Sequence, residues 1–234
     1  QQQAERLKRP FLYLPGSFDY EEIERQEEQL LDELRRMKKL REQTVKKAEA
    51  EREGSFEEAA KHTGASAGIP EITGLDTEKE IRSCEEALSH AKEIIGDTPV
   101  VLDYLFHPRP LGLAKLLLTH GFKVESVYLD SIGPEEKEVF FWLKENIPDL
   151  GLISTIRPEM RVRTRCSERK VLAIGQKAAW FTGSRNFVNM VQGGGLYGFD
   201  GIRRTVQLMV EAFETEKDPE ELIVRKGWGC ESCI

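Results

Sequence analysis

The residues best suited to chemistry lie near the end of the 234-residue chain, where glycines surround a tyrosine. Residues 193–201 have the sequence GGGLYGFDG, follow a strand-like run and precede a helical pattern. Gly193, Gly195 and Gly198 match the spacing of a dinucleotide fingerprint, and backbone N–H groups at a helix start suit a phosphate. Glycines such as Gly194 and Gly195 also let the backbone approach another ligand or subunit, or simply turn tightly. The pattern leaves these three interpretations open.

A second group of candidates follows the first strand-like run of the expected sheet. Asp103 ends that run, and Arg109 stands directly before a helical pattern. A guanidinium there could hold an anionic group together with the positive end of the helix dipole. The alternative is that Asp103 and Arg109 satisfy loop backbone groups or each other. If the glycine-rich loop lines a site, we expect Tyr197 to project toward the carboxyl ends of the strands, close to Asp103 or Arg109.

Metal ligands are sparse. The cysteines of the chain are Cys84, Cys166, Cys230 and Cys233. His62, His90 and His120 have no second ligand at metal-binding spacing, and a lone histidine such as His107 is more often structural or exposed than a ligand. Cys230 and Cys233 form a C-x-x-C pair, whereas a zinc site needs four ligands and a thioredoxin-like pair stands between a strand and a helix. The pair is therefore either a reduced tail or part of a metal site shared across a dimer. Cys84 lies on an apolar helix face, which predicts a place in the core.

Alternating strand and helix patterns position these residues. Strand-like runs occur at 99–103, 123–130, 150–155, 171–174 and 187–191. Helical patterns occur at 110–121 and 134–146 and from about residue 200, and a further helix is expected from Thr77, where Thr77 and Glu80 form a capping box. This alternation predicts a doubly wound, mainly parallel, Rossmann-like α/β domain over residues 75–234.

Residues 1–74 form a different region. A short strand is expected at 10–15, a long charged helix from Asp19 to about Arg52, and a loop or linker at 61–74. The helix carries one narrow apolar stripe, formed by Ile23, Leu30, Leu34 and Met37. A narrow stripe predicts packing against a neighbouring domain or subunit, because a coiled coil requires more heptads.

Composition excludes several classes of function. The formal net charge of −7 gives no electrostatic footprint for nucleic acid or an anionic membrane. No apolar run approaches the roughly 20 residues of a transmembrane helix, and the first residues lack the apolar core of a secretory signal. Sparse cysteine use fits a reducing, cytoplasmic setting. The chain also starts without methionine, which suggests a fragment or a processed chain.

Three stretches resemble the third domain of nitrogenase component 1-type oxidoreductase subunits. They are residues 103–112 (DYLFHPRPLG), 175–179 (GQKAA) and above all 195–201 (GLYGFDG). Residues 10–16 (PFLYLPG) and the charged helix after them resemble the segment between the second and third domains. The similarity covers most of the chain from Pro10 onward. The family includes the nitrogenase α and β chains, their cofactor-assembly scaffolds and dark-operative protochlorophyllide reductase.

The resemblance implies a dimeric or heterotetrameric oxidoreductase component built from Rossmann-like domains. Such a component pairs with a homologous or identical subunit and receives electrons from an ATP-dependent iron–sulfur reductase. Family chains are roughly twice as long as this one, and the cysteines that hold their iron–sulfur cluster belong to an N-terminal domain. We therefore expect no cofactor in the isolated chain and a cluster in the full-length assembly.

The residue at position 197 separates this chain from nitrogenase itself. In the nitrogenase α chain, the residue just before the G-[FY]-D-G element is the histidine that binds the iron–molybdenum cofactor. The matching residue here is Tyr197. A phenol ionises near pH 10 and is a poor replacement for a neutral imidazole at a molybdenum or iron site. The resemblance therefore does not extend to standard cofactor ligation or to dinitrogen reduction.

Three functions follow as hypotheses. The first is the C-terminal part of a nitrogenase-like oxidoreductase subunit, whose residues Asp103, Arg109, Gly194, Gly195 and Tyr197 contribute to a cofactor or substrate cavity. The second is a non-catalytic scaffold or binding module of the same fold. The third is a free-standing Rossmann enzyme that uses a nucleotide. Activity with a reductase partner would separate the first from the second.

We predict that the chain, purified anaerobically, carries no stoichiometric iron or molybdenum, because its cysteines do not form a cluster-binding set. Metal analysis and visible absorbance test this prediction. A brown protein with several irons per chain would contradict it.

Overall fold

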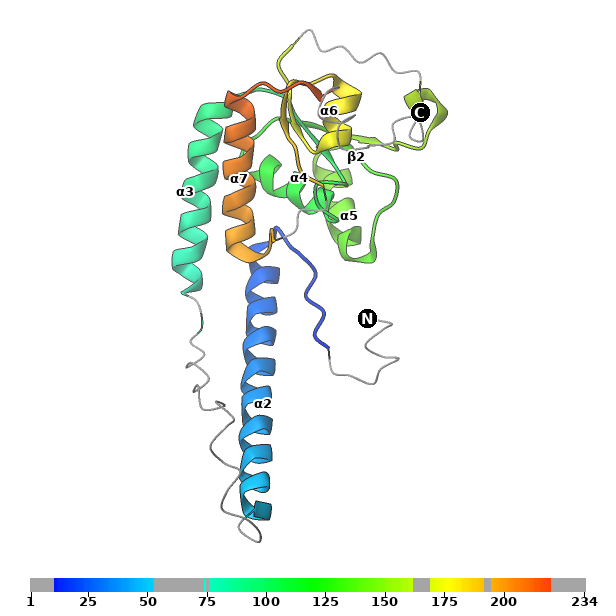
Figure 1. Ribbon diagram of the computed structural model, residues 1–234. Coiled ribbons are helices and arrows are strands. Elements are labelled where there is room, and N and C mark those ends of the chain that lie inside the picture. Colours follow the sequence, from blue (N-terminus) through cyan, green and yellow to red (C-terminus); the bar gives the residue numbers. More distant parts are fainter. Residues whose placement is uncertain (1–10, 53–73, 75, 162–168, 192–194, 220–234) are drawn as a thin grey trace. The chain divides into compact units, whose positions relative to one another are not determined.

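The computed structural model describes residues 11–52, 74, 76–161, 169–191 and 195–219 (Figure 1). The chain divides into two compact units. One consists of Gln1–Pro15 with Glu21–Thr77, and the other of Gly16–Tyr20 with Glu78–Ile234. The division predicted at residue 74 stays a prediction, and each unit is described by itself.

The larger unit is built on a parallel sheet of five strands. The strands are β1 (Val100–Asp103), β2 (Val124–Tyr128), β3 (Gly151–Ile153), β4 (Leu172–Ile174) and β5 (Asn186–Val188). Their order is β3-β2-β1-β4-β5, and every neighbouring pair is parallel. The chain builds outward from β1 in one direction and then from β4 in the other, so the strand order reverses between β1 and β4. This topology confirms the predicted doubly wound α/β fold.

Helices cover both faces of the sheet. They are α3 (Thr77–Ile95), α4 (Pro110–Thr119), α5 (Lys137–Asn146), α6 (Gln176–Thr182) and α7 (Gly198–Glu214), with short 3₁₀ turns η1 (Pro134–Glu136) and η2 (Pro158–Arg161). Ala173 and Phe187 join the buried cluster that contains α6 side chains. Side chains alternate along a strand, so Asn186 points to the other face, where its Nδ2 donates to the α7 carbonyls of Ala212 and Phe213 at 3.1 and 2.9 Å. The two faces therefore have different cores.

The predicted helix from Thr77 is α3, and it packs beside α7 (Figure 1). Its apolar face is buried at Cys84, Leu88, Ala91 and Ile95. The Cys84 thiol lies 3.4 Å from the carbonyl oxygen of Phe199, which confirms its place in the core. At the partly exposed edge of the contact between α3 and α7, Glu80 and Arg203 form an ion pair of 2.6 Å.

The smaller unit contains the long charged helix α2 (Tyr20–Arg52), as predicted. The short strand expected at 10–15 is wrong for its described residues 11–15, which belong to no strand. The side chains of Phe11, Leu12 and Tyr13 are exposed there. An isolated apolar run next to Pro15 has no described strand to pair with, and proline cannot donate to a ladder.

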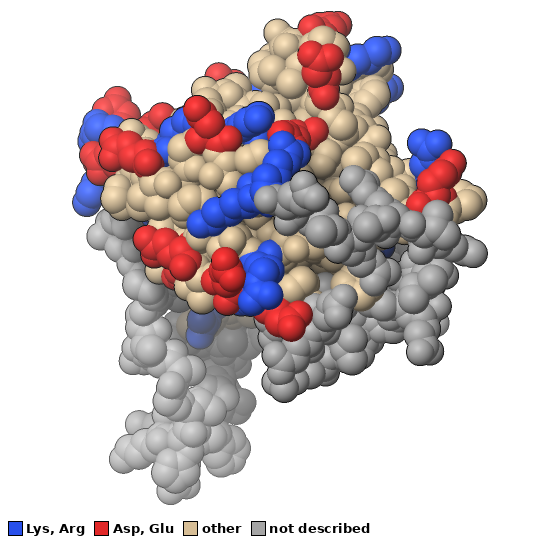
Figure 2. Space-filling view, turned by 90° about the horizontal axis from the view of Figure 1, so that it is seen from above, with Lys and Arg blue, Asp and Glu red and all other residues tan. Residues whose placement is uncertain are grey.

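The surface carries mixed charge. Acidic and basic side chains intermingle over the described part of the face in Figure 2. No described helix combines the length and apolar character needed to cross a membrane.

Helix α6 is the element that the sequence patterns missed, and a distant carboxylate determines where it starts. Gly175 occupies its N-cap position with φ +114° and has no side chain to cap it. Asp103, at the end of β1, supplies the acceptor instead: its Oδ2 receives the backbone N–H of Ala178 at 2.8 Å. Its Oδ1 receives the N–H groups of Leu105 and Phe106 at 2.8 and 3.1 Å. One buried carboxylate thus caps α6 and shapes the loop after β1.

We predict that Gly175→Ala is strongly destabilising. A Cβ at residue 175 would lie 2.3 Å from Asp103 Oδ2, and the backbone has a positive φ that alanine disfavours. We expect a loss of about 3 kcal/mol or more in the free energy of unfolding, measured by chemical denaturation. Gly96→Ala is the matched control, because Gly96 also has a positive φ, but a Cβ there would meet no described atom within 4 Å beyond its chain neighbours. It should cost only about 1 kcal/mol, and equal losses in both variants would contradict the steric argument.

Candidate functional site

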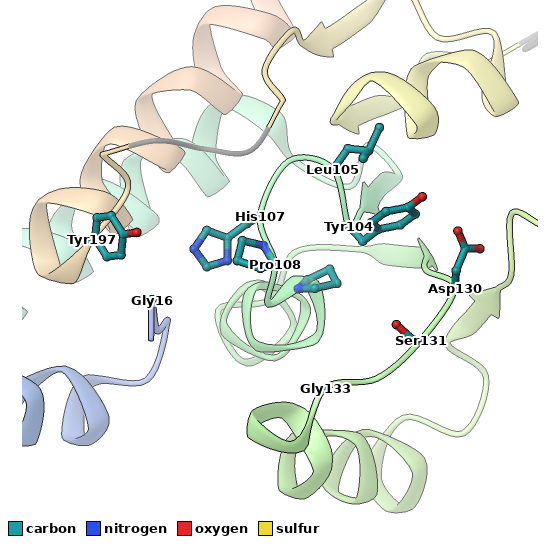
Figure 3. A pocket seen from close by; sticks show the side chains of 10 residues that line it. Gly16, Tyr104, Leu105, His107, Pro108, Asp130, Ser131, Gly133 and Tyr197 are labelled. Carbon is teal, nitrogen blue, oxygen red and sulfur yellow. The ribbon is translucent and has the colours of Figure 1, made fainter. Parts of the chain in front are cut away.

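A crevice of about 530 Å³ lies at the carboxyl end of the sheet. Figure 3 shows its lining, which comes from the loop after β1, the loop after β2, the residue before α7 and Gly16. The lining residues are Gly16, Tyr104, Leu105, His107, Pro108, Pro110, Asp130, Ser131, Gly133 and Tyr197. Parallel α/β sheets bind ligands at this edge, because the loops there converge on one crevice.

Tyr197 borders one end of the crevice. Its side chain is 61% exposed, and it lies near His107 and Gly16 (Figure 3). A Cβ on Gly16 would lie 2.8 Å from His107 Nε2 and 3.7 Å from Tyr197 Cε1, so glycine is required for this close approach. The structure therefore places Tyr197 at the strand-end crevice, next to the loop that carries Arg109. Its role in binding stays a prediction.

His107 is a neutral hydrogen-bond donor at the same end. Its Nδ1 accepts the backbone N–H of Arg109 at 3.1 Å, so the proton of the neutral ring resides on Nε2, which faces Gly16. Phe18 packs edge-on against the ring at a centroid distance of 4.7 Å. Burial, and then the positive charge of Arg109, lower the pKa of His107 to about 4. At neutral pH the ring offers a donor and no charge.

The other end of the crevice carries a polar cluster around Asp130. Thr155 donates to Asp130 through its N–H at 2.7 Å and through its hydroxyl at 2.8 Å. The ammonium of Lys177 lies 3.2 Å from Thr155 Oγ1 and 3.9 Å from Asp130 Oδ2, and it also contacts the hydroxyl of Tyr104. Tyr104 and Asp130 line the crevice, whereas Lys177 is buried behind them.

This cluster holds Asp130 as a carboxylate. Burial by itself would raise the pKa of Asp130, but hydrogen bonds from Thr155 and Tyr104 and the charge of Lys177 hold it below its ordinary value. The crevice thus has a fixed acceptor at one end and a neutral donor, His107, at the other. The sequence analysis did not predict Tyr104 or Lys177 as site residues. Lys177 lies on helix α6, which the sequence patterns did not reveal.

Arg109 lies behind the crevice and does not line it. It is 7% exposed, and its guanidinium donates to the carbonyls of Gly16 at 3.2 Å and Glu135 at 3.0 Å. Asp103 is 1% exposed and is bound by the backbone groups described above. Their observed contacts correspond to the alternative in which both satisfy loop backbone groups. A ligand role for either residue stays a prediction.

A second buried carboxylate, that of Glu136, contacts the start of helix α4 near the crevice. Glu136 is 2% exposed, and its Oε1 accepts the N–H of Gly112 in the first turn of α4 at 2.9 Å. Burial raises the pKa of Glu136 to about 7, against the lowering effect of the backbone N–H groups of Gly112 and Leu111 and of the Arg109 charge. The carboxyl group caps α4 in the way that Asp103 caps α6.

The remaining candidates are Gly194, Gly195, Cys230 and Cys233. Gly194, Cys230 and Cys233 lie outside the described residues. Gly195 has φ +87° and open space beside its Cα, and it does not line the crevice.

An iron–sulfur cluster does not fit the donor set of the described chain. Within that part no three His, Cys, Asp or Glu side chains gather as metal ligands. The described thiol, Cys84, is buried in the α3–α7 contact, and burial raises its pKa to about 11. A cluster ligand has to be a thiolate, so Cys84 is unsuited to that role.

Comparison with known proteins adds little to this picture. No family model matches the chain, and no curated protein matches it in sequence. A solved structure of nitrogenase Cp1 at pH 6.5 matches with 15% sequence identity and a TM-score of 0.43. The match covers 58% of this chain and 33% of that chain, so the matched part spans about one third of the length of that protein. Family membership stays a prediction from the sequence motifs.

We predict that Glu136 makes stability fall as pH rises from about 4.5 to about 7. Its pKa is raised from 4.5 in the folded protein, so the folded state holds the proton more tightly than the unfolded chain does. The stabilisation from protonated Glu136 is complete below pH 4.5, the pKa of its carboxyl group in the unfolded chain. It is lost as pH rises through about 7, the pKa of the same group in the folded protein. Glu136→Gln cannot ionise, so its advantage over wild type should grow by up to about 3 kcal/mol across this range.

Denaturant titrations at several pH values measure this difference. Glu138→Gln, an exposed change on α5, controls for the loss of one carboxylate. Parallel pH profiles of wild type and Glu136→Gln would contradict the prediction.

Proposed function

We propose that this chain is part of a nitrogenase component 1-type oxidoreductase subunit, in which its α/β unit forms one wall of a cofactor or substrate cavity. One observation carries the proposal. Tyr197 occupies the position that corresponds, by the sequence resemblance, to the cofactor-binding histidine of the nitrogenase α chain, and it lies on the crevice at the carboxyl end of the sheet. The motif and the crevice thus support the same location for a ligand.

The lining favours an organic ligand over a bare metal cluster. Tyr104 and Tyr197 supply aromatic rings, and Leu105, Pro108 and Pro110 supply further apolar surface. Polar groups are placed at the ends, where His107 is a neutral donor and Asp130 an acceptor. A planar, largely apolar molecule with a hydrogen-bonding group at each end suits this arrangement. The chemistry of electron transfer would come from groups held outside the described residues.

The nucleotide alternative has less support. A dinucleotide fingerprint belongs in the joint between the first strand and its helix. Here that joint is the segment after Asp103, with the sequence YLFHPR, and it contains no glycine. The glycine-rich segment follows β5, the last strand described in the sheet. A wall of a shared cavity is the more consistent role.

The family part of the proposal is tested on the complete protein. The full reading frame that contains this chain is given an affinity tag, and the protein is isolated anaerobically from its native cells. We expect a second chain of the same fold to be recovered with it, together with iron. Addition of an ATP-dependent iron–sulfur reductase should then support turnover if the protein is an enzyme, and none if it is a scaffold. Recovery of the protein alone and without iron would overturn the family assignment.

The cavity part is tested by filling the crevice. Ser131 lines it, and its neighbour Ile132 is exposed without lining it. We predict that Ser131→Trp in the complete protein lowers bound cofactor or turnover at least about tenfold, because the indole occupies the ligand space. Ile132→Trp adds the same bulk one residue away and should leave both unchanged. Equal effects of the two variants, or none from Ser131→Trp, would contradict a ligand role for the crevice.

A further inference from the structure

The charges of α2 are divided into two halves of opposite sign, with Leu34 between them. Residues 21–33 contain seven acidic side chains and one basic one, a net charge of −6. Residues 35–47 contain seven basic side chains and one acidic one, a net charge of +6. The two halves have equal length and equal and opposite charge.

A solitary helix gains little from this division. Ion pairs between residues three or four apart stabilise a helix, and like charges at that spacing destabilise it. Within each half most such neighbours have like charge, as in Glu24 with Glu28 and Lys38 with Arg41. The ion pairs Arg35–Asp32 and Arg36–Glu33, at 3.2 and 3.5 Å, cross the midpoint instead. The helix dipole acts only over the first and last turns, so it does not account for the inner charges.

An exposed apolar stripe crosses the same midpoint. Leu30, Leu34 and Met37 are 40%, 38% and 56% exposed. Glu27 and Arg41 continue the stripe at helical spacing, one on each side. Ile23 is buried, at 2% exposed, so the exposed apolar part of the stripe begins at Leu30. Apolar side chains thus lie at the centre of the stripe and opposite charges lie at its two ends.

We propose that α2 pairs with α2 of a second copy of this chain, antiparallel, about a twofold axis at Leu34. In this register Leu34 meets its own copy, and Leu30 of each copy meets Met37 of the other. Glu27 of each copy then meets Arg41 of the other, and the −6 half of each helix lies along the +6 half of its partner.

Self-complementarity selects a second copy as the occupant. A twofold interface requires that one surface match itself after rotation, and α2 meets this requirement in both charge and apolar character. A different partner would not require the two halves to mirror each other. A parallel pair would place the −6 half on another −6 half, so the antiparallel orientation is favoured. The argument uses α2 alone and is independent of the proposed function.

The predicted association is salt-sensitive. The apolar seam from Glu27 to Arg41 is only about 22 Å long, so its apolar burial is modest. Exposed charges contribute most of the specificity, and salt screens them. Sedimentation velocity of the whole chain should show a dimer at low ionic strength that dissociates as salt is added.

Charge exchange tests the pairing. An acid-swapped chain carries Glu27→Lys, Asp32→Lys and Glu33→Lys, and a base-swapped chain carries Arg35→Glu, Arg36→Glu and Arg41→Glu. Each alone takes the net charge of its half from −6 or +6 to 0 and makes the two residues at the 27–41 contact alike in charge. Each should therefore weaken its dimer at least about tenfold. An equimolar mixture should form heterodimers, and a chain with all six changes should again form homodimers. Circular dichroism checks that the variants keep their helix content.

Disulfide trapping tests the register. Leu34→Cys should cross-link to its own copy, whereas Glu27→Cys and Arg41→Cys should cross-link to each other in a mixture and not to themselves, with linked peptides mapped by mass spectrometry. In a parallel pair, Glu27→Cys would link to itself. A chain that stays monomeric at all concentrations, a dimer unaffected by the charge swaps, or a parallel cross-link would each overturn the proposal.

Discussion

The carboxylate of Asp103 joins the two halves of the sheet at the point where the strand order reverses. It ends β1, and it accepts backbone N–H groups from its own loop and from Ala178 in α6, 75 residues further along the chain. Gly175 leaves the space that this contact needs. The path of the loop after β1 and the start of α6 both depend on this interaction, and so do the residues that these segments carry to the crevice.

Buried polar contacts determine which side chains line the crevice. Asp103 holds α6, which brings Lys177 behind Tyr104 and Asp130. Glu136 and Arg109 hold the start of α4 and the segment at Gly16 in the same way. Asp103, Arg109 and Glu136 are thus bound to backbone groups around the crevice. The groups left on the lining are aromatic rings, one carboxylate and a neutral imidazole, which suit the recognition of an organic molecule.

The two compact units differ in how their residues are stabilised. The α/β unit is held by apolar burial on both faces of its sheet, and its buried carboxylates Asp103 and Glu136 accept backbone N–H groups. Helix α2 has only a narrow apolar stripe, and its charge is divided between two halves of opposite sign.

The sequence by itself determined the architecture. Alternating apolar runs and helical stripes predicted five strands and the helices α2, α3, α4, α5 and α7. These predictions succeeded because apolar residues repeat every 2 residues in a strand and every 3.6 residues in a helix, so a short stretch of sequence is enough to reveal them. It was wrong about a strand at 11–15, since a strand needs a partner that no local pattern specifies. Helix α6 also escaped, because its seven residues are too few for periodicity and its cap is Asp103. Tertiary structure alone decided that Asp103 contacts α6, that Arg109 contacts Gly16, and that Tyr104, Asp130 and Lys177 meet, because those contacts join residues far apart in the chain.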